Sequence, residues 1–304
     1  MKIGEKVKHT INAELFESLK ILRSILRGHK RLSEIIVGVL VGHPGCLKTR
    51  EEKFSIEASV KTALIPTFFA FASSSKTIVE LSKMPGVHTR DCFGIARAII
   101  ELGINICFIL AEGSSAAEKA LRHSRQKSYR NLERESKIGK LMVKVLYSGK
   151  KDITLTEIHE REIKEFTSKR GFQKNWIDLS LDERIETIGQ SFGERVQILL
   201  QVARLSVYDT ASEILHGTVF GAMYSLGLMD PPVSVSEKSL GNELGDKHFA
   251  VLFGPVLVGF AVEMAFHKKY GYKFLNDRSN KLWRKYGRMP FILKEMEAKK
   301  TRCL

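Results

Sequence analysis

Cysteine and proline are both scarce in this chain, with 4 and 7 residues among 304. Because the cysteines are so few and none forms a Cys-x-x-Cys pair, a small disulfide-stapled domain and a zinc ribbon are excluded. The low proline count, together with only 23 glycines, excludes a collagen-like or low-complexity chain. Hydrophobic residues make up 43% of the chain, which is enough to bury a core, so an intrinsically disordered protein is excluded too.

Several familiar catalytic and cofactor motifs are also missing from the sequence. There is no glycine-rich phosphate loop ending in Gly-Lys-Ser/Thr and no Gly-x-Ser-x-Gly nucleophile elbow. The stretch 159–162, His-Glu-Arg-Glu, lacks the second histidine of a zinc-protease helix. We therefore predict no metal and no cofactor.

Long uninterrupted hydrophobic runs are absent as well. The first ten residues are charged and contain no apolar leader segment. Residues 92–111 are apolar but include Arg97, Glu101 and Asn105, and residues 249–262 form only a short run. A membrane-spanning helix needs about 20 mostly apolar residues. The sequence therefore predicts no membrane span and a soluble cytoplasmic protein.

Helical periodicity is what the sequence has in abundance. Period-2 strand patterns are few, whereas apolar residues recur at helical spacing along most of the chain. We expect helices over residues 11–27, 32–41, 49–84 with a kink or break at Pro66, 89–111, 114–138, 156–169, 181–190, 193–222, 247–269 and 279–300. Residues 230–245, with Pro231-Pro232, form the clearest loop.

This pattern predicts an all-α protein, a multi-helix bundle with a basic C-terminal helical tail. By composition we divide the chain into an N-terminal helical segment (1–48), a helical bundle core (49–269) and the basic tail (270–304).

The net charge of +15 is concentrated in two segments. Residues 119–175 and residues 268–304 each carry a net charge of +9, while residues 176–267 carry −7. Clustered cations can neutralise phosphates, and aromatic residues between them, as in the tail, can stack on unpaired bases. The candidate nucleic-acid-binding residues are Arg122, Arg125, Arg130, Arg134, Lys281, Arg284, Lys285 and Arg288.

The same charge is compatible with roles that involve no nucleic acid. The basic segments can be solvated helix faces, with the aromatic residues docking the tail onto the bundle. An anionic membrane surface or an acidic partner protein would use the same cations. RNA or DNA is the partner that we expect, and the chain can also form a homo-oligomer.

A polar stripe runs along the apolar helix expected at 89–111. Arg97, Glu101 and Asn105 recur every four residues, which places them on one side of the helix. Apolar residues fill the neighbouring faces, so the arginine needs a partner, and Glu101 is the nearest one. A structural ion pair that fixes the helix register explains this stripe as well as a functional site does.

A second stripe follows the helix expected at 193–222. Arg204, Tyr208, Ser212 and His216 also step by four, so one face offers a cation, a phenol, a hydroxyl and an imidazole. A single histidine is more often a structural residue than a catalyst. Two polar stripes that converge make a site more plausible, because convergent titratable groups mark functional sites. The candidate catalytic residues are Arg97, Glu101, Arg204, Tyr208 and His216.

The two stripes also resemble known proteins. Ala96-Arg97-x-x-x-Glu101, followed about a hundred residues later by Tyr208-x-x-x-Ser212-x-x-x-His216-Gly217, resembles a bacterial all-helical family of unknown function over roughly residues 50–225. More distantly, the arrangement is similar to the HEPN helical bundles of toxins and phage-defence proteins. HEPN ribonucleases use an Arg and a His four to six residues apart on one helix, usually across a dimer interface. Here Arg204 precedes His216 by twelve residues, so the resemblance implies the fold and not the ribonuclease chemistry.

Two hypotheses on function follow. The first is a nucleic-acid-directed effector in stress or phage defence, with His216 as general acid–base, Arg97 and Arg204 stabilising phosphate charge, and Tyr208 positioning the substrate. The alternative is a non-catalytic module that binds nucleic acid or a protein, whose polar stripes form a buried structural network. Whether the protein is an enzyme is left open by the sequence.

Overall fold

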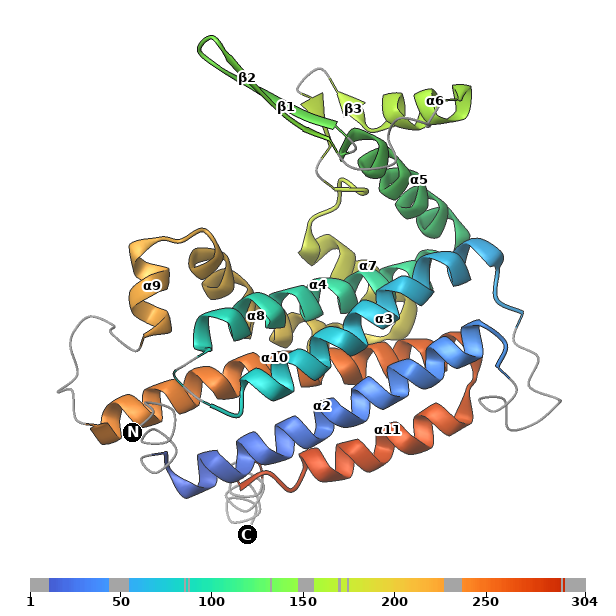
Figure 1. The fold of residues 1–304 in the computed structure, drawn as a ribbon. Helices are drawn as coiled ribbons and strands as arrows, with labels where there is room; N and C mark the ends of the chain where they lie inside the picture. Colours follow the sequence, from blue (N-terminus) through green and yellow to red (C-terminus); the bar gives the residue numbers. More distant parts are fainter. Residues whose placement is uncertain are drawn as a thin grey trace.

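The computed structural model describes residues 11–43, 55–84, 86, 88–131, 133–146, 156–168, 171–173, 175–226, 237–290 and 292, without the side chains of 130–134, 146, 168, 171 and 237–239. These residues form ten α-helices and two small antiparallel hairpins. The all-α multi-helix bundle predicted from the sequence is therefore confirmed (Figure 1).

Two apolar helices, α4 (Thr89–Glu112) and α10 (Glu237–Tyr270), form the centre of the bundle. Helices α2 (Ala13–Leu40) and α3 (Ala58–Leu81) lie against one side, and α8 (Glu194–Leu215) packs against both central helices. The side chains of α4 are buried on most of its circumference because nearly every position outside the polar stripe is apolar.

A glycine lets the two central helices approach closely. A Cβ atom on Gly103 of α4 would lie 2.0 Å from the Cγ1 atom of Val258 on α10. Real carbon atoms do not come that close, so the packing of the Val258 side chain against the α4 backbone at this crossing requires glycine.

A buried polar pair connects α2 to α10. His29 Nδ1 lies 2.6 Å from Glu263 Oε1, and both side chains are almost completely buried. Gly259 makes room for the imidazole, because a Cβ there would lie 2.4 Å from the ring. A buried carboxylate needs such a partner, so the pair explains how an acidic residue is tolerated at the end of an apolar run.

Shorter helices surround this centre. They are α5 (Ser114–Asn131), α6 (Glu157–Glu165), α7 (Leu181–Phe192), α9 (Val219–Ser225) and α11 (Lys273–Tyr286). Ser180 and Glu183 form a capping box that starts α7. Helix α11 packs along α2, so this part of the basic tail expected at 270–304 lies against the bundle, while residues 293–304 are outside the described part (Figure 1).

Helix α5 leads away from the bundle to the two hairpins. The first pairs β1 (Glu133–Ile138) with β2 (Leu141–Leu146), and the second pairs β3 (Thr167–Ser168) with β4 (Gly171–Phe172). Figure 1 shows the β1–β2 hairpin projecting away from the helical bundle, with α5 between the hairpin and the bundle.

The helix expected at 114–138 is wrong beyond residue 131, where the chain enters this hairpin. The charged sequence of β1 has little strand propensity of its own. It is a strand because the β-branched residues Val143 and Val145 of β2 pair with it and because Gly139, at φ +62°, allows the tight turn. The helix expected at 156–169 likewise ends at Glu165.

Several other helix boundaries differ from the prediction. Residues 11–27 and 32–41 belong to one helix, α2. The helix expected at 193–222 is divided by Gly217, at φ +68°, and Thr218 caps α9 by accepting a hydrogen bond from Gly221 N. Pro66 lies inside a continuous α3.

The remaining differences concern the C-terminal third. Helix α10 begins at Glu237, so the loop expected at 230–245 is wrong from that residue on, and residues 227–236 lie outside the described part. Helix α11 ends at Tyr286, whereas the helix expected at 279–300 extends beyond the described residues.

Two helices are long and apolar enough to cross a membrane by length and composition alone, at Thr89–Glu112 and Leu240–Tyr270. In both, most of the apolar window is buried inside the protein. The core helix of a soluble protein has the same properties, so this is weak evidence for a membrane span.

We expect Gly103→Ala to lower the free energy of unfolding by about 1–3 kcal/mol, because the added methyl group overpacks the contact with Val258. Gly94→Ala is the matched control in the same helix. Its nearest neighbour is the end of the exposed Leu215 side chain, which can move, so the variant gains up to about 1 kcal/mol of helix propensity. Urea denaturation measures both, and equal effects of the two substitutions would contradict the close crossing.

Candidate functional site

The two polar stripes meet where α4 packs against α8. Each of the three guanidinium nitrogens of Arg97 donates one hydrogen bond: Nε to Glu101 Oε1 at 3.0 Å, Nη1 to Ser212 Oγ at 3.0 Å and Nη2 to Tyr208 OH at 3.0 Å. Tyr208 OH in turn donates to Glu101 Oε1 at 2.8 Å. We call these four residues the Arg97 network.

The network is half-buried and electrostatically matched. The Arg97 side chain is 21% exposed and that of Glu101 is 41% exposed. The guanidinium carbon also lies 4.3 Å from the centre of the Tyr208 ring, a cation–π distance. The planar guanidinium group of Arg97 therefore makes hydrogen bonds in its plane and contacts the Tyr208 ring with its face.

The protonation equilibria of the network favour the charged arginine and the neutral phenol. Burial acts to lower the pKa of the Arg97 guanidinium, but the hydrogen bonds and charges of Glu101 and Tyr208 outweigh it and raise that pKa. Burial, helped by the hydrogen bond to Glu101, raises the pKa of the Tyr208 phenol above its ordinary value. A phenol in this state is a poor general base near neutral pH.

The other candidate catalytic residues lie outside this network. Arg204 pairs with Asp182 of α7, with Nη2 3.1 Å from Oδ2. His216 is the exposed C-cap residue of α8, and none of the hydrogen bonds of the Arg97 network reaches it. The hydrogen bonds of the network thus join Arg97, Glu101 and Tyr208, and none of them involves Arg204 or His216.

A pair of polar residues between α4 and α7 extends this surface, and one of its members was not selected by sequence reasoning. Arg184 donates from Nη1 to Asn105 Oδ1 at 2.7 Å, so the third member of the first stripe also has an arginine partner. Burial lowers the pKa of the Arg184 guanidinium, while the nearby Glu101 acts in the opposite direction. The spacing of residues within α7 does not reveal the role of Arg184, because its partner Asn105 lies on another helix, 79 residues away in the chain.

Chemically, the Arg97 network directs three of the five N–H donors of its arginine at protein acceptors. All three nitrogens of Arg97 are engaged within the protein, and the hydroxyl of Tyr208 both accepts and donates. A phosphate-stabilising arginine needs donors directed at the ligand. The arrangement therefore cross-links α4 to α8 and gives the two helices a fixed register.

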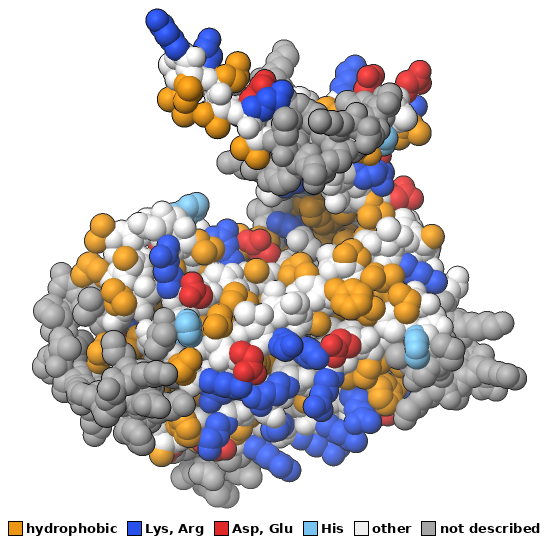
Figure 2. Space-filling model, in the orientation of Figure 1, with side chains coloured by type: hydrophobic (Ala, Val, Ile, Leu, Met, Phe, Trp, Pro, Cys, Tyr) orange, Lys and Arg blue, Asp and Glu red, His pale blue; other side chains and the backbone are white. Residues whose placement is uncertain are grey.

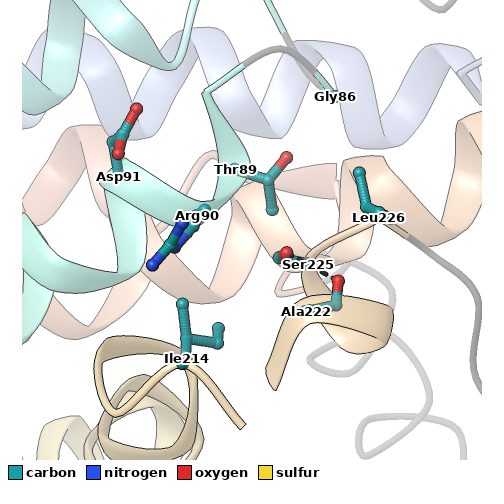
Figure 3. A pocket seen from close by; sticks show the side chains of 9 residues that line it. Gly86, Thr89, Arg90, Asp91, Ile214, Ala222, Ser225 and Leu226 are labelled. Carbon is teal, nitrogen blue, oxygen red and sulfur yellow. Dashed lines mark hydrogen bonds between the residues drawn. The ribbon is translucent and has the colours of Figure 1, made fainter. Parts of the chain in front are cut away.

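A cavity of about 500 Å³ lies next to this contact, between the start of α4, the end of α8 and α9 (Figure 3). It is lined by Gly86, Thr89, Arg90, Asp91, Ile214, Gly217, Ala222, Ser225 and Leu226. The only basic residue in this lining is Arg90, and none of the five candidate catalytic residues contributes to the wall.

A buried histidine supports the cavity wall at Thr89. His248 of α10 lies completely inside the protein, with Nε2 3.2 Å from the Thr89 hydroxyl oxygen. Burial, together with the positive charge of Arg23, lowers the pKa of this imidazole to about 4. His248 is thus neutral at physiological pH.

The candidate nucleic-acid-binding residues fall into two different environments. Arg122 and Arg125 of α5 are engaged in ion pairs with Glu165 and Glu162 of α6. Lys281, Arg284 and Arg288 are exposed on α11 and the turn after it, and Lys285 is partly exposed and donates to Ser24 of α2. The side chains of Arg130 and Arg134 lie outside the described part of the structure.

Metal ligands do not gather anywhere in the described ranges. Within them, no cluster of three or more His, Cys, Asp or Glu side chains could hold a metal ion. Cys92 and Cys107 are free and buried, and burial raises the pKa of the Cys92 thiol to about 12. A thiol with such a pKa is a weak nucleophile.

Comparisons with known proteins give one match. The model of a family of unknown function, DUF5677, matches residues 61–231, a range that runs from α3 past the end of α9. No curated protein and no solved structure matches the chain. The matched range contains the whole Arg97 network, as well as Arg204 and His216.

We expect Arg97→Ala to lower the free energy of unfolding by about 1–3 kcal/mol, because it removes three hydrogen bonds from a half-buried contact and leaves only the one between Tyr208 and Glu101. His216→Ala, at an exposed helix end, should stay within about 0.5 kcal/mol of the wild type. Urea denaturation of both variants tests this. A marked loss of stability in His216→Ala with none in Arg97→Ala would contradict the assignment.

The pKa of His248 predicts an acid-sensitive fold. Its folded value of about 4 lies below the ordinary 6.5, so the unfolded chain binds the proton more tightly. Neutral His248 therefore contributes to the free energy of unfolding in full above pH 6.5. As the pH falls from 6.5 toward 4, this contribution is lost by up to about 1.4 kcal/mol per pH unit. Denaturation midpoints between pH 7 and pH 4.5 should therefore fall less steeply in His248→Gln, and parallel curves for variant and wild type would contradict it.

Proposed function

The chain belongs to the DUF5677 family of unknown function, and we propose that it is a non-catalytic, cytoplasmic nucleic-acid-binding module. The observation that carries this proposal is a basic surface assembled from two helices that are far apart in the sequence. Exposed cations of α2 and α11 lie on one side of the bundle, where Figure 2 shows Lys and Arg side chains gathered. We call this surface the α2–α11 face.

The two helices are held together by close contacts. A Cβ on Gly28 of α2 would lie 2.6 Å from Leu282 of α11, so the glycine allows α11 to approach, and Lys285 donates to Ser24 one turn away. On α2, the exposed Arg31 lies on the same side as Ser24, seven residues further on. The cations of both helices therefore lie along the contact between α2 and α11.

Basic residues predominate on the α2–α11 face, where α2 also carries the exposed Glu17, paired with Lys20, and Glu34. Helix α11 contains one acidic residue, Asp277, against five basic ones. Its basic members, with those of α2, are Lys20, Arg27, Arg31, Lys273, Arg278, Lys281, Arg284, Lys285 and, just after the helix, Arg288. A row of exposed cations on one face can neutralise the phosphates of a nucleic-acid backbone.

The aromatic residues of α11 argue for backbone contacts over base stacking. The Trp283 ring stacks on Phe260 of α10, with ring centres 3.9 Å apart and planes 16° apart. Tyr286 also contacts Phe260, at 6.0 Å. Because these rings dock the helix onto the core, they are not offered to unpaired bases. The proposed ligand is thus a double-stranded nucleic acid, held through its phosphates.

The state of the Arg97 network supports the non-catalytic form of the proposal. Three of the five N–H donors of Arg97 are engaged within the protein, and the pKa of the Tyr208 phenol is raised, which keeps it neutral. A ribonuclease-like effector in stress or phage defence would need His216 and Arg97 at one phosphate, as in the HEPN enzymes that the sequence distantly resembles. No hydrogen bond of the Arg97 network involves His216, which favours the binding module.

We expect the double variant Lys281→Ala/Arg284→Ala to bind a 30-base-pair duplex at least tenfold more weakly than the wild type. Because each lost phosphate contact removes about 0.9 from the slope of log K against log salt, the slope should fall by about 2. Fluorescence anisotropy over a salt series measures both quantities, with duplex DNA and duplex RNA in parallel.

The matched control is Arg161→Ala/Lys164→Ala on α6. It removes the same charge from exposed positions of the other basic segment, at the far end of the molecule from α11 (Figure 1). Its affinity and salt slope should remain within twofold of the wild type. An equal loss in both double variants would show attraction by net charge alone and would overturn the α2–α11 face.

A further inference from the structure

The β1–β2 hairpin has one apolar and one polar face. In its register Ser136 pairs with Val143 and Ile138 with Leu141, whereas Glu135 pairs with Lys144. Since side chains alternate along a strand, Ile138, Leu141, Val143 and Val145 share one face. Their exposed fractions are 65% for Ile138, 63% for Leu141, 43% for Val143 and 50% for Val145.

Such a hairpin is incomplete by itself. An isolated two-stranded sheet is marginally stable in water, and three or more strands are needed for independent stability. Among the described residues β1 and β2 pair only with each other, so each strand also has an outer edge. An edge of this kind is a template for pairing with another strand.

The turn defines which residues face that outer edge. The two turn residues are Gly139, at φ +62°, and Lys140, whose φ is not positive, as in a type II′ turn. In such a turn Ile138 and Leu141 exchange backbone hydrogen bonds, and hydrogen-bonded pairs alternate along the ladder. The backbone groups of Glu135 and Lys137 therefore point away from β2, toward the outer edge of β1.

We propose that this edge pairs with the same edge of a second copy of the chain. The two β1 strands would run antiparallel about a twofold axis at Ser136, which faces its own equivalent. In this register Glu135 of each copy lies opposite Lys137 of the other, and both are hydrogen-bonded pairs. The two hairpins become one four-stranded sheet held by two symmetric Glu–Lys pairs.

Charge complementarity selects a second copy at this edge. Glu135 and Lys137 are two residues apart, so a strand that carries them matches itself when it is turned end to end, and opposite charges facing each other stabilise a sheet. The outer edge of β2 lacks this property, because its outward residues Met142 and Lys144 offer no acidic partner. A nucleic-acid backbone would meet a carboxylate at the β1 edge, which disfavours it.

The position of the hairpin makes the pairing sterically accessible. Figure 1 shows it standing clear of the bundle, and six residues of strand extend about 20 Å. In the antiparallel arrangement the two bodies approach the shared sheet from opposite ends. The proposed interface is separate from the α2–α11 face and does not depend on nucleic-acid binding.

Charge reversal tests the proposed register. In sedimentation velocity over a concentration series, the wild type should dimerise reversibly, and Lys137→Glu should weaken the dimer about tenfold, since it places like charges opposite each other twice. Glu135→Lys should do the same. The double reversal Glu135→Lys/Lys137→Glu restores complementary pairs and should recover the dimer to within about threefold of the wild type.

Cross-linking at the axis gives a second, independent measurement. Cys46 and Cys303 are first replaced by serine, so that the introduced cysteine and the buried Cys92 and Cys107 are the only thiols. In this background Ser136→Cys should form a covalent dimer on mild oxidation. Residues that face each other in a non-hydrogen-bonded pair have Cα atoms about 4.5 Å apart, within disulfide range. Lys140→Cys in the turn is the matched control. In the proposed dimer its two copies lie about 26 Å apart, so it should not cross-link.

The outcomes separate the proposal from its alternatives. A monomer at every concentration, or equal cross-linking of the two cysteine variants, overturns it. A dimer that is unchanged by both single reversals forms through another surface and also overturns it. Far-ultraviolet circular dichroism with a native melting curve shows that each variant retains its bundle, since the hairpin lies outside the hydrophobic core.

Discussion

The burial of α4 is the constraint on which the rest of the structure depends. This helix is enclosed by α3, α7, α8 and α10, so a polar side chain that it carries into these contacts needs a partner there. Arg97 finds one in α8 and Asn105 finds one in α7. The polar stripe of α4 therefore specifies how the surrounding helices are placed. Arg97, Glu101, Tyr208 and Ser212, which form two polar stripes in the sequence, join α4 to α8 in the structure.

Charge and packing are separated in this molecule. In the centre, formed by α4, α8 and α10, Arg97 and Glu263 bind partners within the protein, while α2 and α11 carry exposed cations on one side. The same side chain types thus have different roles in the two places. An arginine with three protein acceptors stabilises the fold, and an exposed arginine between other cations attracts a polyanion. This contrast is why the proposed function rests on the periphery and not on the buried polar residues.

Much of the fold could be predicted from the sequence, and the reasons for success and failure are physical. Long amphipathic periods such as that of α4 determine a helix directly, and the convergence of Arg97 with Tyr208 follows from two matching stripes. The β1–β2 hairpin could not be predicted, because its first strand is stabilised by pairing with a strand eight residues later and has little propensity of its own. The partner of Arg204, Asp182, lies on another helix, and no periodicity within one helix reveals such a contact.

The most direct test of this division between a structural centre and a binding periphery is duplex binding by folded Arg97→Met protein. The substitution removes the charge and the hydrogen bonds of the Arg97 network while keeping most of the side-chain volume. At a temperature well below its melting transition, where circular dichroism shows a native bundle, we predict duplex affinity within twofold of the wild type and no cleavage by either protein. Binding reduced tenfold or more in the folded variant, or cleavage of the duplex that Arg97→Met abolishes, would contradict this division.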